Sequence, residues 1–340
     1  MAAIARLTLL SLVVVVCLGL TRTQGLVEVV PSSGGLPAEV VGQFRSPSAF
    51  QQGPDDNYYV FDRQTQTVYL VSVSGQTTPI VEIGPEQGRI IGANAFDVGP
   101  DGRFVVADAP DGLERVQVFG ADGSRLGGFT LPGRAAPRIT LGSVTLSGVG
   151  SLHFTGRSIV MSQPELGGLV TQFSLDGQPF HTFGVFRATG HEDDRDVHLA
   201  LNSGFPLSTS QGDFYFVFQA GPPLFRKFDA RGQLRFERHI EGQELDGVIA
   251  TLPNTWPKRV DERGREFPVI PPTVRAAAVD RNDNLWVVLT VPVIYVYDSD
   301  GEKIRTLRLR AAGAIHPTSL SFSNGNDLLV TPGCYEFEVW

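Results

Sequence analysis

A short phrase around Asp122-Gly123 recurs along the chain and constrains its fold more than any other feature. Residues 114–129 hold an alternating apolar run, a glycine turn and a second short run that ends in a phenylalanine. Similar phrases stand elsewhere in the chain, at residues 68–77, 170–180, 225–234 and 295–304. Self-similarity of this kind is typical of chains built from copies of one structural unit. The phrase therefore predicts the architecture before any single residue is considered.

The copy that contains Asp122-Gly123 is the clearest and predicts four short strands. Residues 95–98 precede a Gly-Pro-Asp-Gly turn, and residues 103–108 and 115–119 lie on either side of a second turn. Proline presets φ for such turns, and glycine accepts a positive φ at little steric cost. In residues 115–119 the alternation places two valines on one face and polar side chains on the other. A last run ending at Phe129 completes a four-stranded unit.

Six such units fit the chain, and the sixth is incomplete. Residues 316–340 hold three strands and end where a fourth is due. Residues 38–44 have the length and the phenylalanine ending of the missing strand, so we expect them to close the last unit. Closing a ring in this way removes exposed sheet edges. We predict an all-β fold, a six-bladed β-propeller of four-stranded blades whose last blade is closed by an N-terminal strand.

Two stretches carry a family resemblance. Residues 96–108 with 115–123, and residues 279–286 with 295–301, resemble the NHL repeat. The whole chain resembles bacterial six-bladed β-propeller proteins of that superfamily. The resemblance implies that the links from the outer strand of one blade to the inner strand of the next gather on one face. It implies no single function, because the same ring supports binding proteins, lactonases and lyases.

The first 25 residues predict a signal peptide rather than part of the fold. Arg6 precedes an apolar stretch from Leu7 to Leu20, which is shorter than the roughly 20 residues of a membrane span. We expect cleavage after Gly25, a single domain over residues 26–340 and a periplasmic or extracellular location. After cleavage we expect no membrane span; an uncleaved N-terminal anchor is the alternative.

Charge and cysteine content narrow the partners. The formal net charge is −8 and the chain has only three lysines, so we expect no nucleic-acid partner. Removal of the first 25 residues leaves Cys334 as the single cysteine, and no internal disulfide can form. We expect a monomer that binds a protein, a glycan or another polar small molecule.

Three links between units are long, namely residues 130–148, 185–203 and 241–272. Loops of more than about 12 residues in a compact fold are usually functional or disordered. The family resemblance implies that these links meet at the mouth of the central channel. That face is therefore the expected binding site.

The second link holds the densest polar cluster of the chain. His191, Asp194 and His198 lie within eight residues that contain two imidazoles and four carboxylates. Such donors suit a divalent cation at the channel mouth, but the spacing matches no standard zinc pattern and Arg195 interrupts it. A solvated acidic loop explains the cluster more simply. We predict these residues as ligand-binding, without a metal or other cofactor, and keep a divalent cation as the alternative.

The third link offers another candidate surface. Trp256 and Arg259, with Lys258 between them, present a ring and cations to a sugar or an acidic group. Equally, a helix predicted over residues 243–252 plugs the channel mouth instead. The isolated histidines, His153 among them, are predicted as ordinary strand or loop residues.

The sequence contains no compact catalytic motif such as a Gly-x-Ser-x-Gly elbow, a Walker loop or a His-Glu-x-x-His pair. The leading interpretation is an exported, non-catalytic propeller that binds a ligand or a protein through its long-link face. A second hypothesis is a metal-assisted hydrolase or lyase with its site at the channel mouth. A third is a structural interaction module of an envelope complex.

Overall fold

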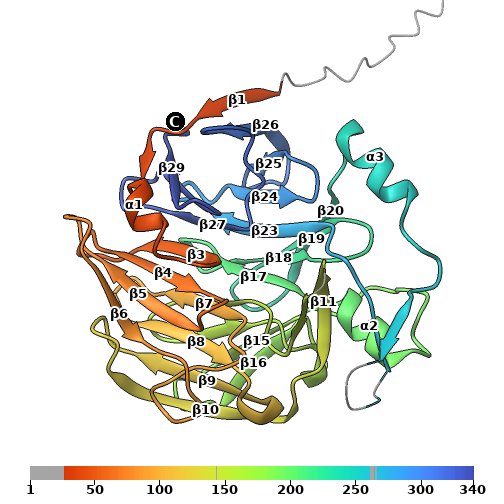
Figure 1. Ribbon diagram of the computed structural model, residues 1–340. Coiled ribbons are helices and arrows are strands. Elements are labelled where there is room, and N and C mark those ends of the chain that lie inside the picture. The colour runs from red at the N-terminus through yellow and green to blue at the C-terminus, as the bar shows by residue number, and fades with distance from the viewer. Residues whose placement is uncertain (1–26, 143, 261–263, 265) are drawn as a thin grey trace, which may run out of the picture.

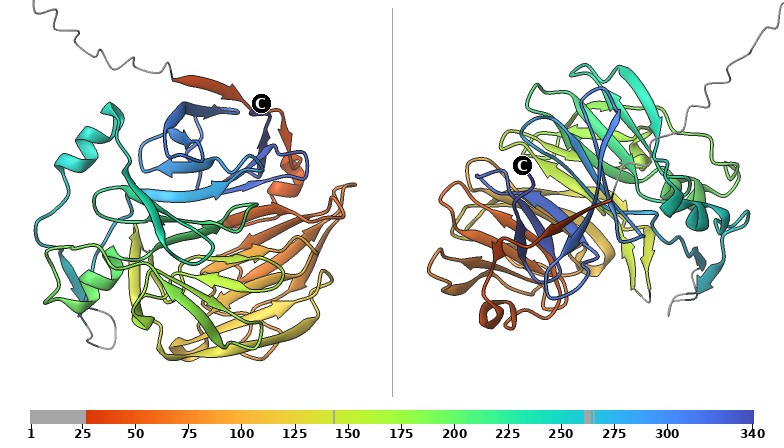
Figure 2. Two further views of the ribbon diagram at one scale, coloured as in Figure 1. Left: turned by 180° about the vertical axis from the view of Figure 1, so that it is seen from behind. Right: turned by 90° about the horizontal axis from the view of Figure 1, so that it is seen from above.

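Six β-sheets form a ring around a central channel in the computed structural model, which describes residues 27–142, 144–260, 264 and 266–340. Figures 1 and 2 show the ring from three sides, with the chain passing around it from red to blue. The innermost strands of neighbouring blades contact one another around the ring. The predicted six-bladed propeller is thus confirmed. The predicted signal peptide, residues 1–25, lies outside the described residues.

Each of the first four blades is an antiparallel meander of four strands. Blade 1 consists of β3 (Pro47–Gln52), β4 (Tyr58–Asp62), β5 (Thr67–Val71) and β6 (Thr77–Val81). Blade 2 consists of β7 (Ala95–Val98), β8 (Phe104–Asp108), β9 (Leu113–Phe119) and β10 (Arg125–Arg134). Blade 3 consists of β13 (Leu152–Phe154), β14 (Ile159–Met161), β15 (Val170–Phe173) and β16 (Pro179–Phe183). Blade 4 consists of β17 (Gly204–Ser208), β18 (Phe214–Phe218), β19 (Leu224–Phe228) and β20 (Leu234–His239).

The last two blades also take up strands from the N-terminal region. Blade 5 consists of β23 (Val274–Val279), β24 (Leu285–Leu289), β25 (Ile294–Tyr297) and β26 (Lys303–Arg310). Its outer edge carries β1 (Glu28–Pro31), which runs parallel to β26. Blade 6 consists of β27 (Ser319–Phe322), β28 (Leu328–Thr331), β29 (Tyr335–Phe337) and the short β2 (Gly34–Gly35), which pairs with β29.

The prediction that residues 38–44 form the closing strand is wrong. Residues Ala38–Val41 form the helix α1, and β2 lies beside β29 in the place expected for that segment. Val40 and Phe44 are both buried in one apolar cluster. A spacing of four residues places two side chains on one face of a helix and equally on one face of a strand. The apolar pattern of this segment therefore does not distinguish the two.

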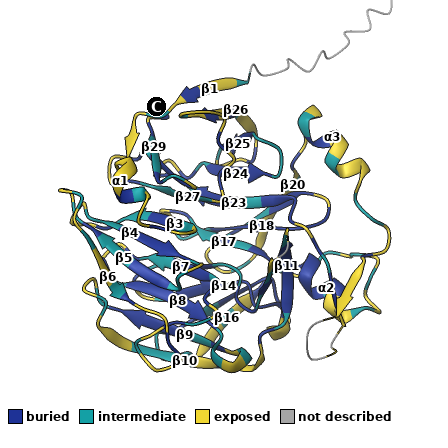
Figure 3. Cartoon of the chain, viewed as in Figure 1, coloured by how far each residue is buried: buried dark blue, intermediate teal, exposed yellow. Residues whose placement is uncertain are grey.

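Aromatic and branched side chains fill the spaces between blades. Tyr59, Phe104 and Phe119 belong to one such cluster between blades 1 and 2. Every residue of β18 and β24 is buried, because the second strand of each blade is covered on both faces by its neighbours. Figure 3 shows these strands in dark blue and much of the outermost strands in lighter colours.

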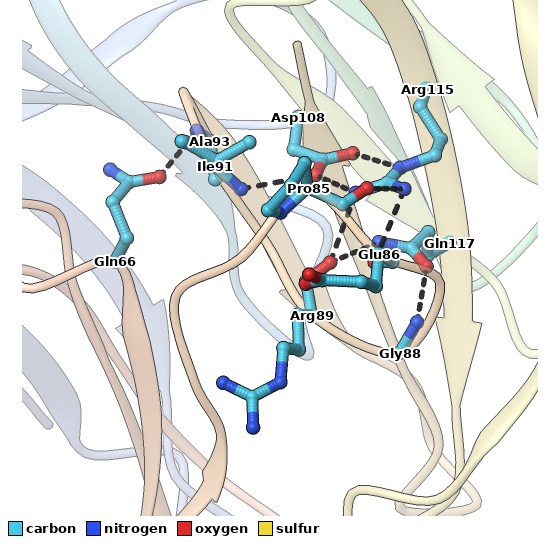
Figure 4. A network of polar contacts seen from close by, with 10 residues as sticks. All are labelled: Gln66, Pro85, Glu86, Gly88, Arg89, Ile91, Ala93, Asp108, Arg115 and Gln117. Carbon is cyan, nitrogen blue, oxygen red and sulfur yellow. Dashed lines mark hydrogen bonds and ion pairs between the residues drawn. The ribbon is translucent and has the colours of Figure 1, made fainter. Parts of the chain in front are cut away.

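A polar network fixes the link between blades 1 and 2 (Figure 4). Arg115 donates to both carboxylate oxygens of Asp108, at 2.9 and 2.6 Å. The same guanidinium donates to three carbonyl oxygens of the link, those of Pro85, Glu86 and Arg89. Asp108 is only 3% exposed. The buried ion pair thus satisfies backbone acceptors in a segment that has no strand partner of its own.

The long links pack together on one side of the ring, to the right in Figure 1. The first forms a hairpin of β11 (Pro137–Leu141) and β12 (Val144–Ser147), and the second carries α2 (Arg195–Leu201). The third carries α3 (Gln243–Ala250) and a hairpin of β21 (Lys258–Val260) and β22 (Glu266–Pro268). Two 3-10 turns complete the elements, η1 (Pro110–Gly112) and η2 (Pro164–Leu166). None of the described helices is both long and apolar enough to cross a membrane.

Candidate functional site

The central channel encloses a cavity of about 700 Å³. Its wall contains residues from the innermost strand of every blade, from the first residue of β3 and β27 to the last residue of β7, β17 and β23. The cavity therefore runs along the full length of these strands. Residues of the first and third long links line it as well, including Thr140, Leu141 and Pro272. Residues 185–203, the second long link, are not in its wall.

Three polar side chains lie in contact with one another in the wall of this cavity. Ser208 Oγ lies 2.7 Å from Nε2 of His153, and Nδ1 of His153 lies 3.1 Å from Oδ2 of Asp97. All three residues line the cavity and all are half-buried. The His153 side chain is 29% exposed and the Asp97 side chain 16%. The three are thus shielded by the blades and still open to a molecule in the channel.

Asp97 determines which nitrogen of His153 carries the proton. An ionised carboxylate only accepts hydrogen bonds, so Nδ1 is the donor toward Asp97. Nε2 is then the acceptor, and the hydroxyl of Ser208 donates to it. Asp97 is held in place by a second bond, because Oδ2 also accepts from the backbone N–H of Phe154 at 2.7 Å. The arrangement is that of a hydroxyl nucleophile, a base and an orienting carboxylate.

The repeat explains how residues far apart in the sequence meet here. Asp97 belongs to β7, His153 to β13 and Ser208 to β17, which are the innermost strands of three consecutive blades. His153 and Ser208 are 55 residues apart in the sequence. Each member lies one blade further around the ring than the one before. The inner strands of neighbouring blades therefore bring their side chains to the same part of the channel.

Two other polar side chains of the wall have structural partners. Gln51 accepts from the backbone N–H of Val98 at 2.7 Å, which joins blades 1 and 2. Ser321 donates to the carbonyl of Phe50 at 2.6 Å, which joins blades 6 and 1. These bonds end on backbone atoms. The bonds of His153 differ, because both join it to side chains that take part in acid–base chemistry.

The residues of the predicted acidic cluster lie outside the cavity wall. Asp194 caps the N-terminus of α2, accepting from the N–H of Val197, and pairs with Lys258 of β21 at 2.9 Å. The hydrogen bond from Lys258 holds the pKa of Asp194 below its usual range. His198, on α2, contacts the hydroxyl of Thr189 through Nδ1 at 2.8 Å. His191 precedes this helix. The structure thus gives the segment a role in joining two links.

Trp256 and Arg259 are also absent from the cavity wall. Trp256 is 6% exposed and belongs to an apolar cluster formed mainly by the three long links: Ile139, Val197, Ala200, Leu201, Ala220, Trp256 and Ile270. Its ring therefore has no open face on which a sugar stacks. Arg259 is exposed on β21. The helix α3 does not plug the channel, because its Leu245 packs against blades 4 and 5 and its Glu244 accepts from the hydroxyl of Tyr295 at 2.6 Å.

A metal site would need several donors close together. Across the part of the chain that the structure describes, no group of three or more His, Cys, Asp or Glu side chains is placed to hold a metal ion. His191, Asp194 and His198 do not form such a group. The described donors near the channel thus do not fit the divalent cation of the metal-assisted hypothesis.

No family model matches the chain, and no curated protein matches its sequence. Solved structures with the same fold do match. A streptogramin B lyase is 12% identical, with a TM-score of 0.52 over 83% of this chain and 75% of that one. A catalytically inactive His-to-Ala variant of virginiamycin B lyase from Staphylococcus aureus, with quinupristin, is 13% identical, with a TM-score of 0.50 over 84% and 77%. A gluconolactonase from Xanthomonas campestris is 15% identical, with a TM-score of 0.50 over 91% and 95%.

These likenesses establish the fold, a six-bladed propeller of the kind found in lyases and gluconolactonases. They contradict the leading interpretation of a non-catalytic binding protein, because the neighbours that share most of the chain are enzymes. The hypothesis of a hydrolase or lyase fits them better. The sequence contains no compact catalytic motif, and residues contributed by three separate blades leave none.

Proposed function

We propose that this protein is a hydrolase that cleaves an ester or lactone bond inside the central channel. The observation that carries the proposal is the chain Asp97–His153–Ser208 in the wall of a cavity of about 700 Å³. Ligand pockets of such volume admit small organic molecules. The gluconolactonase among the structural neighbours supports a cyclic ester as the kind of substrate.

The hydrogen-bond geometry assigns each residue a role in the reaction. Ser208 Oγ attacks the carbonyl carbon of the substrate while its proton passes to Nε2 of His153. The tetrahedral intermediate then expels the alcohol oxygen, which takes that proton from Nε2 and leaves an acyl group on Ser208. Asp97 accepts from Nδ1 throughout and stabilises the positive charge of the imidazolium.

A water molecule completes the cycle. It attacks the acyl carbon and gives a proton to Nε2 of His153, and Ser208 takes a proton back as the bond to its oxygen breaks. The net reaction adds one water to one ester, so an alcohol and a carboxylic acid result, or a hydroxy acid from a lactone. General-base catalysis by a placed histidine contributes a factor of about 10²–10⁴ to the rate.

A lyase reaction is the second candidate, and one observation favours it. A streptogramin lyase shares the fold, and a His-to-Ala variant of virginiamycin B lyase is catalytically inactive. In such a reaction Nε2 of His153 would take a proton from a carbon atom of the substrate, and the carboxylate would leave with formation of a double bond. Product mass separates the two reactions, since hydrolysis adds a water and elimination does not.

Turnover of small esters and lactones by the purified protein tests the proposal. We expect hydrolysis of p-nitrophenyl butyrate or δ-valerolactone, and a loss of about 10³-fold or more in kcat for Ser208→Ala and His153→Gln. A fluorophosphonate probe should add its mass to the peptide that contains Ser208. The matched control is Ser321→Ala, which removes a hydroxyl from the same cavity wall but leaves the His153 chain intact.

Melting curves check that the variants fold like the wild type. Ser208→Ala and Ser321→Ala should melt within a few degrees of the wild type, since each loses one partly exposed hydrogen bond of about 1 kcal/mol. Equal activity of the wild type and Ser208→Ala, or probe addition at some other serine alone, would refute the role of Ser208. If the products together have the mass of the substrate without an added water, the reaction is an elimination and the lyase proposal replaces the hydrolase proposal.

The expected surroundings of the enzyme are part of the proposal. We propose that residues 1–25 direct export, that the enzyme is a monomer in the periplasm or outside the cell, and that its partner is a polar small molecule. The NHL-like phrases at residues 96–108 and 279–286 support kinship with that repeat superfamily. N-terminal sequencing of the protein recovered from the envelope fraction tests the cleavage site.

A further inference from the structure

Two arginine side chains line the same cavity, and neither guanidinium has a hydrogen-bond or ion-pair partner among the described residues. Arg63 follows β4, and Arg275 is the second residue of β23. In both, the guanidinium Nε is buried and has no hydrogen-bond partner. Neither guanidinium forms an ion pair with any residue that the structure describes. Arg115 and Arg305 show the usual alternative, since each pairs with a carboxylate.

Both arginines belong to the end of the cavity where the links enter. The inner strand of blade 6, β27, contacts both β3 and β23, so the two side chains approach from either side of that blade. Arg63 donates its backbone N–H to Ser46, just before β3 begins. Arg275 lies next to Val274, the first residue of β23. The two cations therefore share one mouth of the channel.

The charge of the wall is unbalanced. The ionisable residues that line the cavity are Arg63, Asp97, His153 and Arg275. Asp97 is already bonded to His153 and to the N–H of Phe154. With His153 neutral, the wall has one positive charge in excess. Burial lowers the pKa of Arg63, as expected for a cation that has lost water and gained no counter-charge.

The hydrogen bonds between neighbouring strands place these cations relative to Ser208. The N–H of Gln219 donates to Ser203 and the N–H of Val274 donates to Gln219, so Val274 lies level with Ser203. Arg275 then lies near the start of β17, whereas Ser208 ends that strand. Strands rise about 3.3 Å per residue, which over four residues separates the two levels by roughly 13 Å. A substrate thus extends along the channel.

We infer that Arg63 and Arg275 form a subsite for a carboxylate, so that the substrate is a monoanionic ester or lactone that carries a free acid group. This inference rests on the proposed function for the ester bond. A guanidinium offers several N–H donors in a planar fork that matches a carboxylate. One negative charge on the ligand balances the single excess positive charge of the wall, whereas a dianionic phosphate does not.

Calorimetric titration of the full chain bearing Ser208→Ala tests the subsite without turnover. The probes are monomethyl adipate, dimethyl adipate and inorganic phosphate. The six-carbon chain, together with the length of an arginine side chain, spans the separation of roughly 13 Å between the two levels. We expect the monoanion to bind at least about tenfold more tightly than the neutral diester or phosphate. Equal affinity for the monoanion and the diester, or tighter binding of phosphate, overturns the inference.

Arginine variants in the same background locate the effect. Arg63→Gln and Arg275→Gln should each reduce the preference for the monoanion by about tenfold, and Arg→Lys at either position should retain part of it. The control is Arg157→Gln, which removes the same charge from an exposed residue outside the cavity wall. Melting curves check that each variant folds. A preference that survives both glutamine variants overturns the inference.

The two proposals fail in different experiments. Hydrolysis of the neutral p-nitrophenyl butyrate by the wild type reports on Ser208 and His153 alone. Binding of monomethyl adipate to the Ser208→Ala protein reports on the arginines alone. Anion binding without any hydrolysis sinks the proposed function, and hydrolysis without an anion preference sinks the carboxylate subsite.

Discussion

His153 Nε2 lies 2.7 Å from Ser208 Oγ across the boundary between blades 3 and 4. Neither residue belongs to a recognisable catalytic motif in the sequence. Each lies on the innermost strand of its own blade. Their contact exists only because the ring brings consecutive inner strands together. Asp97, one blade earlier, extends the contact into a chain of three. The reactive arrangement is therefore a property of the ring rather than of any one blade.

The variant Asp97→Asn tests whether the charge of the carboxylate supports His153 as a base. Oδ2 of Asp97 meets both the N–H of Phe154 and Nδ1 of His153, so an amide oxygen in that position would keep both contacts without a full negative charge. The imidazolium that forms when His153 takes the proton of Ser208 would then lose its counter-charge. We expect kcat to fall about 10³–10⁴-fold with little change in melting temperature.

A second aspartate of blade 2 provides the control for this experiment. Asp101 forms an exposed ion pair with Arg103, so Asp101→Asn removes the same charge away from His153. Its kcat should equal that of the wild type. If Asp97→Asn kept full activity in the same assay, the orienting role of Asp97 would be disproved.

Much of the fold is predictable because it depends on local signals that repeat. The glycine turn after each alternating run marks the third and fourth strands of blades 2 to 5, where β9 and β10 are the clearest case. The prediction for the N-terminal segment, residues 38–44, fails because the segment is too short for its apolar positions to distinguish a helix from a strand. Val40 and Phe44 fit both a strand that ends in phenylalanine and a helical face, and only the packing against blade 1 decides between them.

The site is not predictable for a different reason. His153 stands alone in the sequence, and an isolated histidine predicts an ordinary strand residue. One signal is present: a polar residue in the short innermost strand of consecutive units, such as Asp97 in Ala-Phe-Asp-Val. The acidic run at 191–198 includes a helix cap, Asp194, and a dense cluster of charge on a surface link is compatible with that structural role.

The variant Arg115→Met tests the network of Figure 4. The change leaves the carboxylate of Asp108 buried without its counter-charge, and breaking a buried pair in this way destabilises a protein by about 3–5 kcal/mol. Burial already raises the pKa of Asp108, and Arg115 opposes that rise. Without the arginine the pKa rises further. Denaturant unfolding at several pH values measures the effect.

The sign of this pH dependence follows from the raised pKa. In the variant, the folded state holds the proton of Asp108 up to a higher pH than the unfolded state does. The loss of stability relative to the wild type is therefore greatest at neutral pH and shrinks as the pH falls through the folded-state pKa. Arg157→Met is the control, because that side chain is exposed. A loss below about 1 kcal/mol at neutral pH, typical of a surface pair, would contradict the structural role.

Removing metal ions tests the alternative of a metal-assisted reaction. Because the described residues offer no group of three donors, we expect EDTA to leave the melting temperature and the esterase activity unchanged. A bound ion would instead stabilise the folded state by mass action, and its removal would lower the melting temperature. Elemental analysis of the same sample checks for a stoichiometric metal. A metal that is lost together with activity would restore the metal-assisted hypothesis.

The contact between Asp194 and Lys258 joins α2 to β21 and should respond to acid. Its hydrogen bond from Lys258 lowers the pKa of Asp194, so the stabilisation is present above the unfolded-state pKa and is lost as the pH falls through the lower folded-state value. Both side chains are partly exposed, at 34% and 46%. The ion pair is therefore strongly screened by solvent and contributes little to stability. Asp194→Asn keeps a helix cap and should lose only that small contribution.

Asp194→Ala removes the cap as well as the ion pair and should lose about 1 kcal/mol more than Asp194→Asn. The neighbouring Asp193→Ala serves as the control, since Asp193 is exposed and lies outside the cap. Unfolding midpoints at pH 7 and at pH 3 give both comparisons, and added salt should narrow the difference between the wild type and Asp194→Asn. Because these residues lie outside the cavity wall, kcat should stay constant in all three variants. A fall in kcat without a fall in stability would return the second link to the active site.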